Sequence, residues 1–75
     1  MNNKTKRTIK DKARLAYGLS HVLKDDIDIL RVSTCKDDWK DLISVTQDTR
    51  ETVQKLLDTL VDMEYYLYLS KFNES

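Results

Sequence analysis

Hydrophobic and small polar residues between Trp39 and Ser70 recur at alternating steps of three and four. The series consists of Trp39, Leu42, Thr46, Thr49, Val53, Leu56, Leu60, Met63, Leu67 and Ser70. This is the heptad spacing of a helix that packs along another helix. At a rise of about 1.5 Å per residue the span is on the order of 50 Å long, more than so short a chain can bury alone. The pattern predicts a helix over residues 35–71 whose seam needs a neighbour.

A second periodic stretch, which begins at Ile9, predicts a preceding helix over residues 8–32. Its apolar positions at helical spacing are Ile9, Ala13, Ala16, Leu19, Leu23, Ile27 and Leu30. Gly18 within it indicates either the close approach of another helix or a tolerated exposed glycine. Aspartates near the C-terminal end leave open a break at Lys24, because the helix dipole disfavours anions there. Thr34 is the expected N-cap of the second helix, and the short link favours an antiparallel hairpin.

The fold predicted from these elements is an all-α, two-helix antiparallel hairpin that self-associates into a helical bundle. The simplest form is a homodimer, in which two hairpins make four helices. We expect residues 1–7 to be a disordered basic arm, residues 8–72 to be a single helical domain and residues 73–75 to be a disordered tail. One cysteine and one histidine in 75 residues leave no intrachain disulfide and argue against a metal site, so association is the expected source of stability.

The long second helix carries two candidate interaction surfaces. The predicted oligomer interface consists of Trp39, Leu42, Val53, Leu56, Leu60, Met63 and Leu67. Thr46 and Thr49 add polar layers to this seam, which are either a tolerated weak point or a device that sets register. Past Leu56 the helix is apolar on a second side, and the predicted partner-binding residues there are Tyr65, Tyr68 and Phe72. The preceding helix over residues 8–32 and a self-dimer could cover this side, or a foreign protein could bind it.

The zero net charge hides a division between a basic start and an acidic remainder. Residues 1–14 hold six basic residues and one acidic residue, 6 − 1 = +5, so the rest of the chain carries −5. The candidate nucleic-acid contacts are Lys4, Lys6, Arg7 and Lys10. Such residues neutralise phosphates without reading bases; the alternatives are a solvated tail or attraction to acidic residues of the chain's own oligomer. Three aspartates at the turn, Asp37, Asp38 and Asp41, are candidates for partner binding or simply a solvated helix end.

The sequence offers little chemistry for catalysis. It contains no glycine-rich phosphate loop and no Glu-x-x-His motif, and neither His21 nor Cys35 has a catalytic partner at recognisable spacing. We therefore predict no catalytic, cofactor-binding or metal-binding residues and no enzyme activity. Apolar runs fall short of the roughly 20 residues of a membrane span and the chain starts with polar and basic residues, so we expect a cytoplasmic protein with no membrane partner.

These features favour a small protein-binding module that acts as a regulator or inhibitor, with itself and an unidentified protein as partners. Lysine outnumbers arginine nine to four, and Ala, Gly and Pro together number three, which hints at an AT-rich genome such as that of a low-GC bacterium or its phage. The alternatives are a nucleic-acid-binding accessory protein that uses the basic arm weakly, and a structural assembly subunit.

Overall fold

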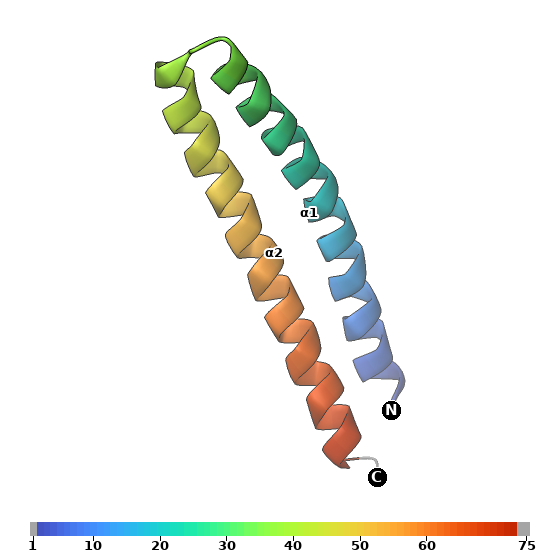
Figure 1. The fold of residues 1–75 in the computed structure, drawn as a ribbon. Coiled ribbons are helices and arrows are strands. Elements are labelled where there is room, and N and C mark those ends of the chain that lie inside the picture. Colours follow the sequence, from blue (N-terminus) through green and yellow to red (C-terminus); the bar gives the residue numbers. More distant parts are fainter. Residues whose placement is uncertain (1, 74–75) are drawn as a thin grey trace.

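The computed structural model describes residues 2–73, and over that range the chain forms two α-helices, α1 (Asn3–Cys35) and α2 (Trp39–Asn73). The helices lie antiparallel, so both chain ends are at the end of the molecule opposite the turn (Figure 1). The principal extents are 55 × 15 × 13 Å, which describe a rod one helix pair wide. The predicted all-α hairpin is confirmed.

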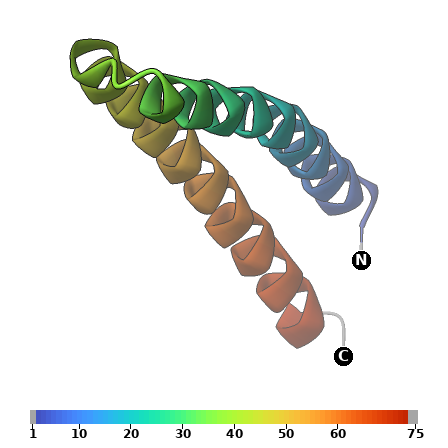
Figure 2. The same ribbon diagram turned by 45° about the horizontal axis from the view of Figure 1, so that its top comes forward.

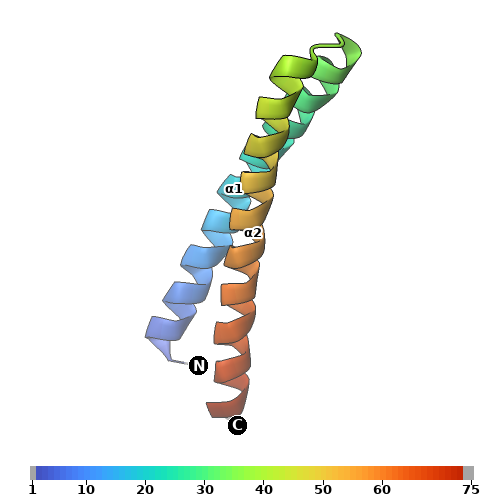
Figure 3. The same cartoon turned by 90° about the vertical axis from the view of Figure 1, so that its left-hand side faces the viewer.

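The helices do not run parallel along their whole length. In the side view they cross at a shallow angle (Figure 3). In the tilted view they diverge from the turn toward the chain ends (Figure 2). A shallow crossing is the geometry in which heptad positions of one helix pack between those of the other.

Helix α1 begins at Asn3 rather than at residue 8, because a cap lies further upstream than the apolar pattern indicates. The Asn2 side chain accepts a hydrogen bond from the backbone N–H of Thr5 at 2.7 Å, which satisfies one of the free donors of the first turn. Residues 3–7, expected to be disordered, therefore form the first turns of α1, while Met1 lies outside the described residues. The helix is continuous through Lys24, so the break that the aspartates left open does not occur.

The turn between the helices is short and hydrogen-bonded. Asp37 has a φ of 55°. Its N–H donates to Thr34 O at 3.2 Å, and the N–H of Asp38 donates to Ser33 O at 3.1 Å, so both groups bond back into α1. These two bonds and the left-handed residue make a Schellman termination. The Asp38 side chain accepts from Asp41 N–H at 3.2 Å, so Asp38 caps α2. The prediction of Thr34 as this cap is wrong, since Thr34 lies in the last turn of α1.

The helices meet along positions that we call the inner seam. On α1 these are Ile9, Lys12, Ala16, Leu19, Leu23, Asp26, Leu30 and Ser33. On α2 they are Leu42, Val45, Thr49, Thr52, Leu56, Thr59, Met63, Tyr66 and Ser70. Both series alternate in steps of three and four and are less exposed than their neighbours, so the hairpin is an antiparallel coiled coil.

The inner seam is unusually polar. Its buried residues are Ser33, Thr52 and Thr59, and no apolar side chain among the described residues is buried. The Thr52 hydroxyl lies 3.0 Å from Asp26 Oδ2 and 3.1 Å from Asp48 O, whereas Thr59 donates to the carbonyl of its own helix at Lys55, 2.8 Å away. The hydroxyls are satisfied, but they contribute little hydrophobic stabilisation compared with leucine at the same positions.

Candidate protein-binding surfaces

A second heptad series runs along the outside of α2, and we call it the outer seam of α2. It consists of Trp39, Ile43, Thr46, Arg50, Val53, Leu57, Leu60, Glu64 and Leu67, at alternating steps of four and three. All are exposed, with Leu57 at 52% and Leu60 at 48% of their possible surface. Trp39, Ile43 and Thr46 line an apolar hollow at the turn end of this seam. The outer seam therefore has the spacing of a helix-packing surface without a helix against it.

The predicted oligomer interface combines residues from both seams. Leu42, Leu56 and Met63 belong to the inner seam and face α1. Trp39, Val53, Leu60 and Leu67 point outward and stay exposed. Successive residues on a helix point about 100° apart. The predicted series departs from the inner seam by one residue at alternate positions, so about half of its members lie on another face. The prediction thus followed the most apolar path along α2, which crosses between two surfaces.

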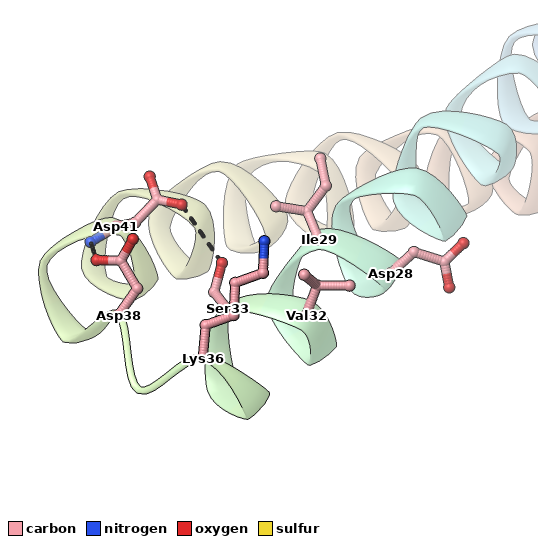
Figure 4. Close-up of a pocket in the computed structure, with 7 residues that line it drawn as sticks. All are labelled: Asp28, Ile29, Val32, Ser33, Lys36, Asp38 and Asp41. Carbon is pink, nitrogen blue, oxygen red and sulfur yellow. Dashed lines mark hydrogen bonds between the residues drawn. The ribbon is translucent and has the colours of Figure 1, made fainter.

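Helix α1 carries a smaller apolar stripe on the opposite face of the hairpin, made of Leu15, Val22, Ile29 and Val32. Ile29 and Val32 share a hollow with Asp38 and Asp41 (Figure 4). Asp41 lies one position before Leu42 of the inner seam, so the α1 stripe is on that flank of the seam. On α2 the outer seam lies on the other flank of the inner seam. The hairpin therefore presents apolar positions on both faces.

The hollow near the turn combines apolar, acidic and basic groups, since Lys36 lines it together with the aspartates. Ile29 and Val32 contribute the apolar part, and the carboxylates of Asp38 and Asp41 lie around the turn (Figure 4). The Ser33 hydroxyl donates to Asp41 Oδ2 at 3.4 Å, a long bond that leaves most of that carboxylate free for water or a ligand. Of the three aspartates predicted as partner-binding, Asp38 and Asp41 lie in this hollow, whereas Asp37 forms the turn itself.

The aromatic residues near the end of α2 lie on different faces. Tyr65 and Tyr68 are exposed and line a shallow hollow together with Val61 and Glu64. Tyr66 lies in the inner seam, and its ring meets that of Tyr65 edge to face with centroids 5.7 Å apart. The side chain of Phe72, the third predicted partner residue, lies outside the described residues.

The basic residues of the first turns are on the surface. Lys4, Lys6, Arg7 and Lys10 are all exposed on α1. Within the described chain, the ion pair formed by this region joins Lys12 to Asp62 of α2 at 3.1 Å, with both side chains partly exposed. Such a pair contributes at most about 1 kcal/mol. The four predicted phosphate contacts are thus presented from a helix rather than from a flexible arm.

The candidates for reactive chemistry are isolated from one another. The ring of His21 packs edge to face on Tyr17 with centroids 4.5 Å apart, and Cys35 is exposed at the end of α1. Among residues 2–73, no three His, Cys, Asp or Glu side chains gather as metal ligands would.

The fold is an all-α helical hairpin, and comparison with known proteins adds nothing to this class: neither family models, nor curated proteins, nor solved structures give a match to the chain. Neither described helix has an uncharged apolar stretch long enough to cross a membrane.

Proposed function

We propose that the protein is a small helical protein-binding module that self-associates through one face of its hairpin and binds another protein through the opposite face. In this role it acts as a regulator, adaptor or inhibitor by occupying surfaces, without chemistry of its own. The observation that carries the proposal is the distribution of apolar side chains: none is buried in the described hairpin, while helix-packing stripes are exposed on both faces.

Energetics support association. Burying apolar surface stabilises a folded chain by about 25 cal/mol per Å². Here the inner seam mixes apolar residues with Thr, Ser, Lys and Asp and buries no apolar side chain fully, whereas Trp39, Val53, Leu57 and Leu60 keep 46–63% of their surface exposed. Chains of this size seldom reach useful stability from a single small core, and packing a second helix on the outer seam supplies the missing burial.

The opposite face is the proposed site for another protein. Its stripe from Leu15 to Val32 offers apolar contacts at helical spacing, and Asp38 and Asp41 lie at the turn end of the same face. An amphipathic helix with basic residues near one end matches this arrangement, because its apolar side would cover the stripe while its cations meet the carboxylates.

The experiment is affinity capture from the native host with two matched variants. Ile29→Lys adds a cation to the proposed partner face, and Leu57→Lys adds one to the outer seam. The proposal expects Ile29→Lys to lose a captured protein without changing the mass of the oligomer, and Leu57→Lys to dissociate the oligomer. If the captured proteins and the oligomer mass are the same for both variants and the original chain, the proposal is wrong.

A further inference from the structure

We propose that the self-interface is an antiparallel pairing of α2 with α2 of a second copy, along the outer seam, with a two-fold axis at Leu57. This assignment rests on the proposed self-association and adds its surface, direction and register. It also brings the two charged residues of the outer seam, Arg50 and Glu64, opposite each other in the two copies.

The placement of these two charges carries the inference. Arg50 lies seven residues before Leu57 and Glu64 lies seven residues after it, 57 − 50 = 64 − 57 = 7. An antiparallel two-fold pairing centred on Leu57 therefore sets Arg50 of each copy against Glu64 of the other. A parallel pairing in register would instead set Arg50 against Arg50 and Glu64 against Glu64, which is unfavourable in a desolvated interface.

Neither charge is satisfied within the described hairpin. Arg50 and Glu64 are both exposed, and the sequence has no opposite charge three or four residues from either one. The neighbouring Glu51, by contrast, has Lys55 at the favourable i, i+4 spacing. Two unpaired opposite charges within an otherwise uncharged series can specify the direction of a seam, since polar seam residues select register and orientation.

The rest of the seam is compatible with this pairing. Val53 and Leu60 lie near the axis together with Leu57, so the centre is apolar. Gln47 and Gln54 lie one helical position beside the seam and are uncharged, so they introduce no repulsion between copies. The apolar hollow lined by Trp39, Ile43 and Thr46 would face the C-terminal end of α2 of the second copy.

The pairing also sets α1 of one copy against α1 of the other. Cross-helix contacts of Lys12 with Asp62 and of Thr52 with Asp26 place Leu57 of α2 beside the stretch of α1 around Ser20. On the flank of α1 that shares a face with the outer seam, the exposed residues include Ala13, Tyr17, Ser20, Lys24 and Ile27. In a two-fold pairing centred at Ser20, small Ala13 lies opposite large Ile27 of the second copy, so α1 and α2 of both copies contribute to a four-helix arrangement with Tyr17 and Lys24 on the same flank.

Charge exchange tests the pairing on the full chain by sedimentation equilibrium. Arg50→Glu and Glu64→Arg should each weaken the dimer by at least about tenfold, because each variant sets like charges together twice per dimer. The double variant should recover the original affinity, and an equimolar mixture of the two single variants should form a heterodimer of that affinity. Lys55→Glu, a reversal on the other flank of α2, is the matched control and should leave the dimer unchanged.

Cross-linking tests the direction. In a Cys35→Ser background, Leu57→Cys should form a disulfide-linked dimer on mild oxidation, because the two copies of residue 57 meet at the axis. Gln47→Cys should not, since ten residues on either side of the axis separate its copies by about 30 Å.

The outcomes separate this assignment from the proposed function. A dimer that cross-links through Gln47→Cys, or that ignores both charge reversals, overturns the antiparallel pairing and leaves self-association standing. A chain that is monomeric at all accessible concentrations overturns both.

Discussion

Truncating Leu60 separates the stability of the hairpin from that of the dimer. Leu60 keeps 48% of its surface exposed in the hairpin and lies on the outer seam, so the proposed dimer would bury the remainder. Complete burial of a leucine is worth about 1.5–3 kcal/mol, and the half buried on association about 1 kcal/mol per copy. Leu60→Ala should therefore weaken the dimer by about 2 kcal/mol, or about thirtyfold in Kd.

Leu15→Ala is the matched control for this measurement. Leu15 is 50% exposed, close to Leu60, and the substitution changes helix propensity in the same way, but Leu15 lies on the opposite face. Sedimentation equilibrium of the two variants and the original chain gives the three dissociation constants. We expect Leu15→Ala to match the original chain. Equal dissociation constants for Leu60→Ala and Leu15→Ala would refute the assignment of the outer seam to the self-interface.

Further predictions concern the seam, the turn and the basic start. Thr52→Val should lower the free energy of unfolding in urea by about 1–2 kcal/mol, because it removes the hydroxyl that donates to Asp26. Thr59→Val breaks only a bond within its own helix and should be neutral or stabilising. Equal effects of the two substitutions would contradict the cross-helix role of Thr52. Asp37→Gly should raise the thermal midpoint, with a gain of about 1 kcal/mol, because glycine adopts the left-handed conformation without strain; a lower midpoint would contradict this. Nucleic-acid binding measured by fluorescence anisotropy should be weak, independent of sequence, lost as salt rises and abolished by deleting residues 2–7; tight sequence-selective binding would favour the accessory-protein alternative.

The two helices follow from the sequence because their period of three and four residues persists over many turns. Their ends do not, because caps depend on single side chains. Asn2 starts α1 ahead of any apolar residue, and Asp38, rather than Thr34, accepts the first bond of α2. Both candidates for the second cap are chemically suitable, and only the Schellman turn through Asp37 decides between them.

The division of α2 into two seams was harder to predict. Thr52 and Thr59 face α1 while the more apolar Val53 and Leu60 face outward, because α1 itself offers polar partners such as Asp26. A rule that places the most apolar path inside fails where the facing helix contributes polar residues to the seam, as Lys12, Asp26 and Ser33 do here. The signal was nevertheless present: positions one residue apart form two interleaved heptad series, which is the pattern of a helix with two neighbours.

The most direct test of self-association is the mass of the full chain in solution. The chain is 8.8 kDa, so sedimentation equilibrium across the micromolar range should give a mass rising toward 17.6 kDa, 2 × 8.8, and the thermal midpoint should rise with protein concentration. An 8.8 kDa species at every concentration, with a cooperative melt whose midpoint is independent of concentration, would contradict the account.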